Sequence, residues 1–325
     1  GIAFYRRQCS LAGEHKGKKI RIRFAAVNYA ASVWVNGAHI GEHEGGYTPF
    51  EFDISEAVRF DEENTLTVRV VDPPNDGSGR EIDGLRHMEI PSGKESWYVN
   101  FSGIWQGVEL LITERTYVKD VFVVPDVKRG IIQARMTIRC QKNHKGRLSF
   151  IVTTLDGETE LARQVRPVHL DKGLDEISLD IPVPGFEVWS PDNPALYLLT
   201  AGFSMRGGFE DSITVRFGMR SMEVTNNAFM LNGNRIMLRG VLNQQQYSKN
   251  LAYPESKEEA RRIVRLMKEG GWNLIRMHIR PTTPEFLDVC DEEGMLVFEE
   301  PAIGWIVESD TLRERALTEV RDMVR

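Results

Sequence analysis

The chain has 325 residues, of which 41% are hydrophobic, so it is too long for one ordinary domain and can fill two or three cores. Its net charge of −6 comes from 47 acidic and 41 basic residues that are mixed along the sequence. This mixture leaves no basic stripe for nucleic acid and no cationic amphipathic face for a membrane, and it favours a neutral or small-molecule partner.

Local patterns exclude two further classes of protein. No run of about 18 apolar residues occurs, so no transmembrane helix is expected. Cys9, Cys140 and Cys290 are odd in number and far apart, which argues against a disulfide framework or a zinc site and favours buried thiols. No signal peptide is recognisable, but residues 4–7 already read as a strand, as if upstream sequence were missing. The compartment stays open between the bacterial cytoplasm and the periplasm or the exterior.

The first part of the chain alternates apolar and polar residues with a period of two. This pattern predicts half-buried antiparallel strands at 19–24, 32–35, 50–54 and 65–70. Asn36 and Gly37 follow one of these strands and suit a tight hairpin, because both tolerate a positive φ. Such spacing without helices predicts an all-β jelly-roll sandwich over residues 1–115. Within this domain, the Gly-rich loop that begins at residue 72 lacks the ligand spacing of a calcium loop, so no metal is expected.

The middle of the chain continues the all-β pattern. Short strands are predicted at 131–139, 147–153, 176–181, 197–203 and 212–217. Two prolines in the tract 189–194 deny ladder hydrogen bonds and make it a loop. About seven short strands in roughly a hundred residues predict an immunoglobulin-like β-sandwich over residues 116–221.

From residue 222 onward, strands alternate with helices. Strands are predicted at 235–241, 273–278 and 295–298. Ser256 with Glu259 forms a capping box before one helix, Thr283 with Pro284 begins a second, and a third covers 312–320. This alternation is typical of a parallel α/β structure. Residues 222–325 therefore read as the start of a (β/α)8 TIM barrel, about three of its units.

Several motifs carry a resemblance to a known family. In the first domain they are residues 33–37, 45–50 and 102–108, and in the second the tracts 189–197 and 217–220. The most specific match is to the family's first signature, whose spacing is met by Asn273, Arg276, Pro281, Phe286, Leu287, Asp291, Gly294 and 295–298. With these motifs the chain resembles the glycoside hydrolases of family 2, which include β-galactosidases, β-glucuronidases and β-mannosidases.

The chain departs from the family pattern at two places. Where the signature usually has His-Tyr before Pro281, this chain has Ile279 and Arg280, with His278 one place early. The tract 242–246 stands where many members carry a His with acidic neighbours. These departures leave the sugar specificity open, and Arg280 reads equally well as a surface charge.

The catalytic pair of such an enzyme is not expected within this chain. Retaining glycosidases need two carboxyl groups about 5 to 5.5 Å apart, as nucleophile and as acid/base. The resemblance puts one at the end of the fourth barrel strand and the other on a later strand. Glu299 and Glu300 do not replace them, because neighbours on a strand point to opposite faces.

The candidate residues for substrate binding lie at the ends of the predicted barrel strands and just outside them. The resemblance makes Glu300 a binding or orienting carboxylate, although an ion pair with Arg239 or Arg276 is equally good. The full set is Arg239, Asn243, His278, Glu300, Trp305 and Trp97. We expect Arg239, His278 and Glu300 to converge at the mouth of the barrel, with Trp305 at its rim and Trp97 at the domain junction.

The sequence thus predicts a portion of a retaining exo-β-glycosidase that hydrolyses O-glycosidic bonds in carbohydrates without a cofactor or metal. The expected partner is a β-glycoside, with no nucleic acid and no membrane. The alternative is a non-catalytic carbohydrate-binding or scaffold protein with a degenerate barrel. A sheet of three strands leaves an open edge, so either further chain or a homo-oligomer is expected to cover it.

Overall fold

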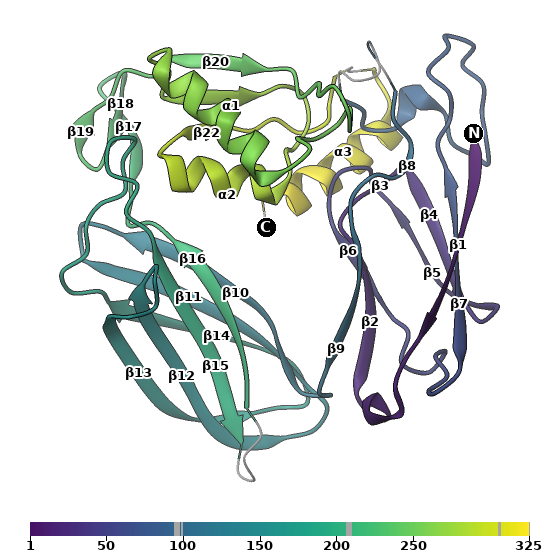
Figure 1. Ribbon diagram of the computed structural model, residues 1–325, viewed down its shortest axis with the longest axis horizontal. Coiled ribbons are helices and arrows are strands. Elements are labelled where there is room, and N and C mark those ends of the chain that lie inside the picture. Colours follow the sequence, from purple (N-terminus) through teal and green to yellow (C-terminus); the bar gives the residue numbers. More distant parts are fainter. Residues whose placement is uncertain (94–97, 99, 206–209, 305–306, 325) are drawn as a thin grey trace.

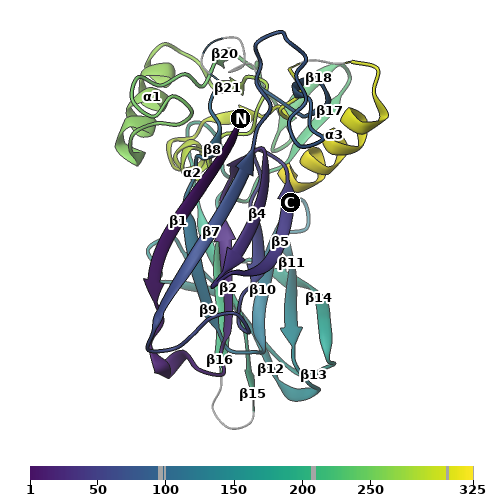
Figure 2. The ribbon, with the colours of Figure 1, turned by 90° about the vertical axis from the view of Figure 1, so that its right-hand side faces the viewer.

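The computed structural model describes residues 1–93, 98, 100–205, 210–304 and 307–324. It consists of two β-sandwiches that lie side by side and an α/β unit that packs across one end of both (Figure 1; Figure 2). Figure 1 shows the first sandwich at the right, the second at the lower left and the helices above them.

The first sandwich has two facing sheets with strand orders β1-β7-β4-β5 and β6-β2-β9, and a small pair β3-β8. Its elements are β1 (Ile2–Ser10), η1 (Gly13–His15), β2 (Lys19–Phe24), β3 (Val27–Asn28), β4 (Ala30–Val35), β5 (Ala38–Glu44), β6 (Phe50–Asp53), β7 (Glu63–Val71), η2 (His87–Glu89), β8 (Gly103–Ile104) and β9 (Val108–Thr113). Alternate residues of β2 and β4, such as Ile22 and Val33, fill the core between the sheets. Asn36 (φ 52°) and Gly37 (φ 84°) form the predicted tight turn between β4 and β5.

The second sandwich pairs the sheet β10-β11-β14 with the sheet β13-β12-β15-β16. Its strands are β10 (Tyr117–Asp126), β11 (Ile131–Cys140), β12 (His144–Thr154), β13 (Glu160–Leu170), β14 (Gly173–Pro182), β15 (Tyr197–Met205) and β16 (Glu210–Phe217). Ile132 and Met136 of β11 pack against Phe150 and Leu199 of the facing sheet, whereas their polar neighbours point to solvent. This arrangement is the predicted immunoglobulin-like sandwich.

The α/β unit begins with the small sheet β17-β18-β19 and continues as the parallel sheet β20-β21-β22. Its elements are β17 (Met222–Thr225), β18 (Ala228–Leu231), β19 (Asn234–Arg235), β20 (Gly240–Asn243), α1 (Lys257–Glu269), β21 (Leu274–Met277), α2 (Pro284–Glu293), β22 (Leu296–Phe298) and α3 (Asp310–Met323). The predicted strand 235–241 is wrong in its extent, because residues 236–239 separate β19 from β20.

The two faces of the parallel sheet have different surroundings. Ile275 and Met277 point to the helix layer, where they pack against Val264 of α1 and Phe286 of α2. The opposite face carries Leu242, Arg276 and Phe298, which the strand register aligns in one row. In a TIM barrel the helices cover the outside, so this row belongs to the inner face. The unit is the first part of such a barrel.

Helix boundaries follow the sequence signals. Ser256 caps α1 by accepting a hydrogen bond from the backbone N–H of Glu259. Pro284 occupies the first turn of α2, and Gly294 ends that helix with φ 72°. Since these signals act over a few residues, they fix helix ends regardless of the rest of the fold. Within the described ranges, no helix is long and apolar enough to cross a membrane.

An ionic contact fastens the barrel unit to the second sandwich. Arg216 of β16 donates to Glu292 (2.7 Å) and to the side chain of Asp288 (2.6 Å), both on α2. Trp189, fully buried, donates its indole N–H to the carbonyl of Asp291 at 2.9 Å. The second sandwich and the barrel helix α2 are thus joined by hydrogen bonds as well as by packing, which fixes the position of the barrel unit on the sandwich.

Candidate substrate-binding site

The candidate site lies where the parallel strands end, at the edge of the sheet at which barrel enzymes form their sites. His278 directly follows β21, and Glu300 lies two residues after β22. The Nδ1 atom of His278 lies 3.4 Å from Oε2 of Glu300, and the two side chains are 12% and 16% exposed. The structure therefore brings together two of the predicted site residues, largely shielded from solvent, at the ends of the strands.

Glu300 is held by several donors. Its carboxylate accepts hydrogen bonds from Nε of Arg276 (2.6 Å) and from the backbone N–H of Ile279 (2.8 Å). Burial by itself would raise the pKa of Glu300, but the Ile279 N–H, the Arg276 guanidinium and His278 together lower it below its ordinary value. Glu300 is thus an ionised, oriented hydrogen-bond acceptor at neutral pH.

The turn after β21 has an unusual backbone. Ile279 has φ 53°, in the left-handed region that β-branched residues rarely adopt. Conformations of this kind cost about 1–3 kcal/mol and persist only where the surrounding structure holds them. Here the turn aims the N–H of Ile279 at Glu300 and sets His278 beside the same carboxylate. The strained turn is therefore part of the site's geometry.

Glu299 faces away from Glu300. It accepts a hydrogen bond of 2.6 Å from the backbone N–H of Thr282, and burial raises its pKa despite that bond. The two neighbouring carboxyl groups thus have different partners and pKa shifts in opposite directions. The different partners follow from strand alternation, which points neighbouring side chains to opposite faces of the sheet.

Arg239 does not join the pair at the mouth, so the expected convergence was wrong for this residue. It precedes β20 and therefore lies at the opposite end of the strands. Its Nε atom donates to the carbonyl of Gly271 at 2.6 Å, and its backbone N–H donates to Asn273. The physical reason is the break at residues 236–239, which moves Arg239 from the predicted strand interior to the strand's beginning.

Asn243, at the carboxyl end of β20, points to the side opposite His278. The register pairs it with Met277, which is buried in the helix layer. Its side chain accepts from the N–H of Gln245 (2.8 Å) and donates to the hydroxyl of Tyr247 (3.3 Å). These contacts hold the loop after β20 in place, and they direct the Asn243 side chain away from the mouth of the barrel.

Trp97 and Trp305 lie outside the described residues. The described residues that precede each of them in the chain, however, lie side by side. Ser92 forms a parallel bridge with Ile303, and its carbonyl accepts a hydrogen bond of 2.8 Å from the N–H of Gly304. The first domain thus reaches the loop after β22, beside the mouth of the barrel.

Arg280 is a functional candidate that was not predicted from the sequence, because an exposed surface charge explained an arginine at this position equally well. It is 1% exposed. Its guanidinium donates to the carbonyl of Ala252 at 2.8 Å and lies 5.1 Å from the ring centre of Phe101 in the first domain. The sequence offered one signal, the replacement of the family's usual aromatic residue by a cation at this position.

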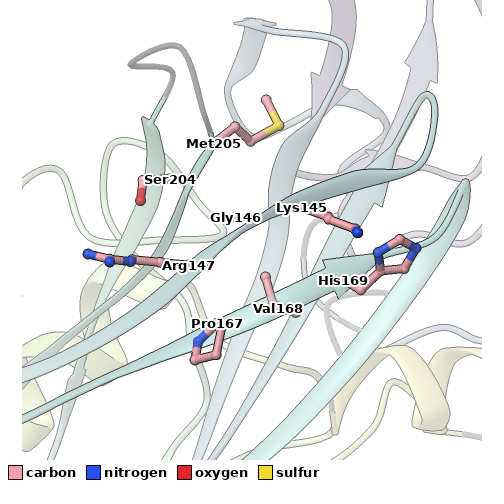
Figure 3. Close-up of a pocket in the computed structure, with 8 residues that line it drawn as sticks. All are labelled: Lys145, Gly146, Arg147, Pro167, Val168, His169, Ser204 and Met205. Carbon is pink, nitrogen blue, oxygen red and sulfur yellow. The ribbon is translucent and has the colours of Figure 1, made fainter.

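A depression lies on the middle sandwich, away from the barrel (Figure 3). It has a volume of about 640 Å³ and is lined by β12, β13 and β15, with Lys145 of β12 directly opposite His169 of the neighbouring strand β13. None of the described residues that line it is a carboxylate, so it lacks the groups that glycosidic chemistry needs. Across the described part of the chain, no three His, Cys, Asp or Glu side chains are arranged to hold a metal ion.

Three family models cover almost the whole chain. They describe the sugar binding domain of the family 2 glycosyl hydrolases over residues 1–114, the glycosyl hydrolases family 2 domain over 116–220, and the family's TIM barrel domain over 222–319. The order of the three models is also the order of the three structural units. The match therefore extends to the barrel segment that carries His278 and Glu300.

Curated relatives and solved structures point to the same family. A β-galactosidase of Thermoanaerobacter pseudethanolicus is 32% identical over 94% of this chain, which covers 40% of that protein. A β-glucuronidase of Bacteroides fragilis is 29% identical over 100% of the chain and is covered to 48%. The crystal structure of a Bacteroides uniformis β-glucuronidase matches the whole chain with a TM-score of 0.84 at 27% identity and is covered to 39%. The chain thus spans less than half the length of these relatives, and it belongs to glycoside hydrolase family 2.

Proposed function

We propose that this chain is a portion of a retaining exo-β-glycosidase whose nucleophile and acid/base carboxylates lie outside residues 1–325. The observation that carries the proposal is the pair His278 and Glu300, an imidazole and an oriented carboxylate 3.4 Å apart at the mouth of a family 2 barrel. The names of the relatives, β-galactosidase and β-glucuronidase, support a β-glycoside as the substrate.

In this proposal Glu300 and His278 bind sugar hydroxyls. A carboxylate accepts hydrogen bonds from hydroxyl groups, and hydrogen bonds to a charged acceptor are about twice as strong as neutral ones. Arg276 and the N–H of Ile279 hold the carboxylate in place before a sugar arrives, which reduces the entropy that binding must spend. Trp305 and Trp97 remain proposed sugar-stacking residues. Arg239 and Asn243 are better assigned to the loop contacts described above.

The inner face of the sheet needs a cover in the folded protein. Leu242 and Phe298 on this face are 43% and 56% exposed. We propose that further barrel strands cover it in the whole enzyme and that a second copy covers it when the chain is produced alone, as a homo-oligomer. Light scattering of the 325-residue protein tests the second part, and a monomer at micromolar concentration would contradict it.

Binding to the 325-residue chain tests the proposed site. Aryl β-glucuronide, galactoside, mannoside and glucoside would be titrated and followed by calorimetry. At least one should bind, and Glu300→Gln should weaken its affinity about tenfold or more, because a charge-assisted acceptor is lost. Glu299→Gln is the matched control, since Glu299 neighbours Glu300 in the chain but bonds to Thr282 instead. Equal affinity in the Glu300→Gln variant, or no binding by any of the four glycosides, would overturn the proposed site.

A further inference from the structure

Arg280 is buried at the junction between the first domain and the barrel. Burying a guanidinium is costly unless the surroundings supply acceptors and aromatic faces in fixed positions. The junction supplies both, from segments far apart in the sequence.

The aromatic faces come from the first domain. The ring centres of Phe101 and Trp105 lie 5.1 and 5.9 Å from the guanidinium carbon of Arg280. The two rings lie 5.0 Å from each other, and Trp105 is anchored by a hydrogen bond of 2.8 Å from its indole N–H to the carbonyl of Gly46. A cation over such faces is attracted by the ring quadrupole, and this attraction is stronger when the cation is desolvated.

The acceptors come from the barrel. Nη2 of Arg280 donates to the carbonyls of Gln245 and Ala252, both in the loop after β20. The side-chain amide of Gln245 in turn donates to the carbonyl of Arg280 at 2.8 Å. One side chain from the loop after β21 thus ties down the neighbouring loop. A planar guanidinium can serve two carbonyls and two rings together, whereas an ammonium group cannot.

The anchored backbone is the turn that shapes the candidate site. Arg280 directly follows Ile279, whose φ of 53° aims its N–H at Glu300 over 2.8 Å. His278 precedes the same residue. Because the side chain of Arg280 is fixed on both sides of the junction, its Cα is fixed as well, and the strained residue before it cannot relax into a commoner conformation without breaking those contacts.

We propose that Arg280 is a positioning residue, which links the aromatic cluster of the first domain to the turn that presents His278 and the Ile279 N–H to Glu300. The importance of the turn for sugar binding rests on the proposed function. The positioning itself does not, since it concerns the geometry of the sugar-free protein.

The experiment compares two variants of the 325-residue protein with a matched control. Arg280→Met keeps the bulk of the stem and removes every donor, and Arg280→Lys keeps the charge but not the planar fork. Arg239→Met is the control, because the Arg239 guanidinium also donates to a backbone carbonyl but at the opposite end of the same sheet. Two quantities are measured without sugar: the carboxyl titration of Glu300 by ¹³C NMR, assigned with Glu300→Gln, and the hydrogen exchange of the Ile279 amide.

Arg280→Met should move the titration of Glu300 upward, toward the ordinary range of a glutamate. It should also speed exchange of the Ile279 amide by about tenfold, as the hydrogen bond between them is lost. Arg280→Lys should give smaller changes in the same directions, and Arg239→Met should give neither. An Arg280→Met protein that melts earlier but keeps the parent's titration and exchange would reduce Arg280 to a packing role and overturn the proposal.

If Arg280→Met does not fold, Arg280→Lys decides. A folded lysine variant with both quantities unchanged would also overturn the proposal. These outcomes are separable from the sugar titrations. Loss of positioning with intact sugar binding would contradict only the use of this turn in binding, whereas absence of sugar binding in the parent would contradict the proposed function alone.

Discussion

Glu319 of α3 accepts a hydrogen bond of 2.6 Å from the backbone N–H of Gly46 in the first domain, although its carboxyl group is almost completely buried. Burial, opposed by that hydrogen bond and reinforced by Asp322, raises the pKa of Glu319 to about 7 from the ordinary value of 4.5. The contact between the barrel's third helix and the first domain therefore depends on a carboxyl group that titrates near neutrality.

This shift predicts a pH dependence of stability. A carboxyl group whose pKa is raised on folding stabilises the fold in its protonated form, so its contribution is complete below about pH 4.5 and is lost as pH rises through about 7. Glu319→Gln removes this ionisable group. The free energy of unfolding of the variant, relative to that of the parent, should therefore rise by at most about 3 kcal/mol between pH 4.5 and 7. Chemical unfolding at a series of pH values measures it.

The control for this prediction is Glu314→Gln, an exposed glutamate on the same helix. The groups near Glu319 also include Asp322, which raises its pKa, and His43, whose own pKa burial lowers. Both variants keep these groups, so their titrations cancel in the difference from the parent. A flat difference between pH 4.5 and 7.5 for Glu319→Gln would show that the buried carboxyl is not destabilising when ionised.

The ion pairs of Arg216 with α2 predict a second effect on stability. Arg216 is 19% exposed in its side chain and holds two carboxylates of α2, so Arg216→Ala should lower the free energy of unfolding by about 1.5–3 kcal/mol. Arg163→Ala breaks a pair with Glu160 that is half exposed on both sides, and it should cost less than about 1 kcal/mol. Calorimetry should also show the barrel and sandwich transitions moving apart in Arg216→Ala alone. An equal loss of unfolding free energy in both variants would contradict a stabilising role of Arg216 at the interface between the sandwich and the barrel unit.

A glycine at the same interface separates backbone strain from steric conflict. Gly294 has φ 72°, and a Cβ there would lie 2.5 Å from the carbonyl oxygen of Pro191 in the second sandwich. Gly271 has φ 86° with open space around it. Gly271→Ala should therefore cost only the conformational strain, about 1 kcal/mol, and Gly294→Ala should cost at least about 2 kcal/mol because the interface must also open. Thermal melts of both variants decide it, and equal shifts would mean that the interface yields easily.

The 325-residue chain should not turn over aryl β-glycosides, even if it binds them. A retaining mechanism needs a second carboxyl group about 5 to 5.5 Å from the first, and the two adjacent candidates, Glu299 and Glu300, face opposite ways. Release of the aryl group from the galactoside, glucuronide, mannoside and glucoside is the measurement. Turnover that survives purification and is abolished by Glu300→Gln would move the catalytic role onto Glu300 itself.

Features that depend on neighbouring residues alone were predictable from the sequence. The turn at Asn36 and Gly37, the cap at Ser256 and the helix end at Gly294 lie where the pattern put them, because positive φ and orphaned N–H groups are satisfied within a few residues. The succession of two sandwiches and an α/β unit followed in the same way from the change of hydrophobic period. The pairing of His278 with Glu300 needed only strand alternation and the parallel order of the sheet.

Only the tertiary structure decided where a strand begins and what a buried charge meets. Arg239 lies at the amino-terminal end of β20, away from the mouth, because four residues without strand structure separate β19 from β20. No local sequence signal marked this break. Arg280 looked like a surface charge because its partners Phe101 and Trp105 lie about 180 residues earlier in the chain. Hydrophobic period and capping report on neighbours in sequence, whereas the burial of a guanidinium depends on which distant segments pack around it, and that is settled when the domains dock.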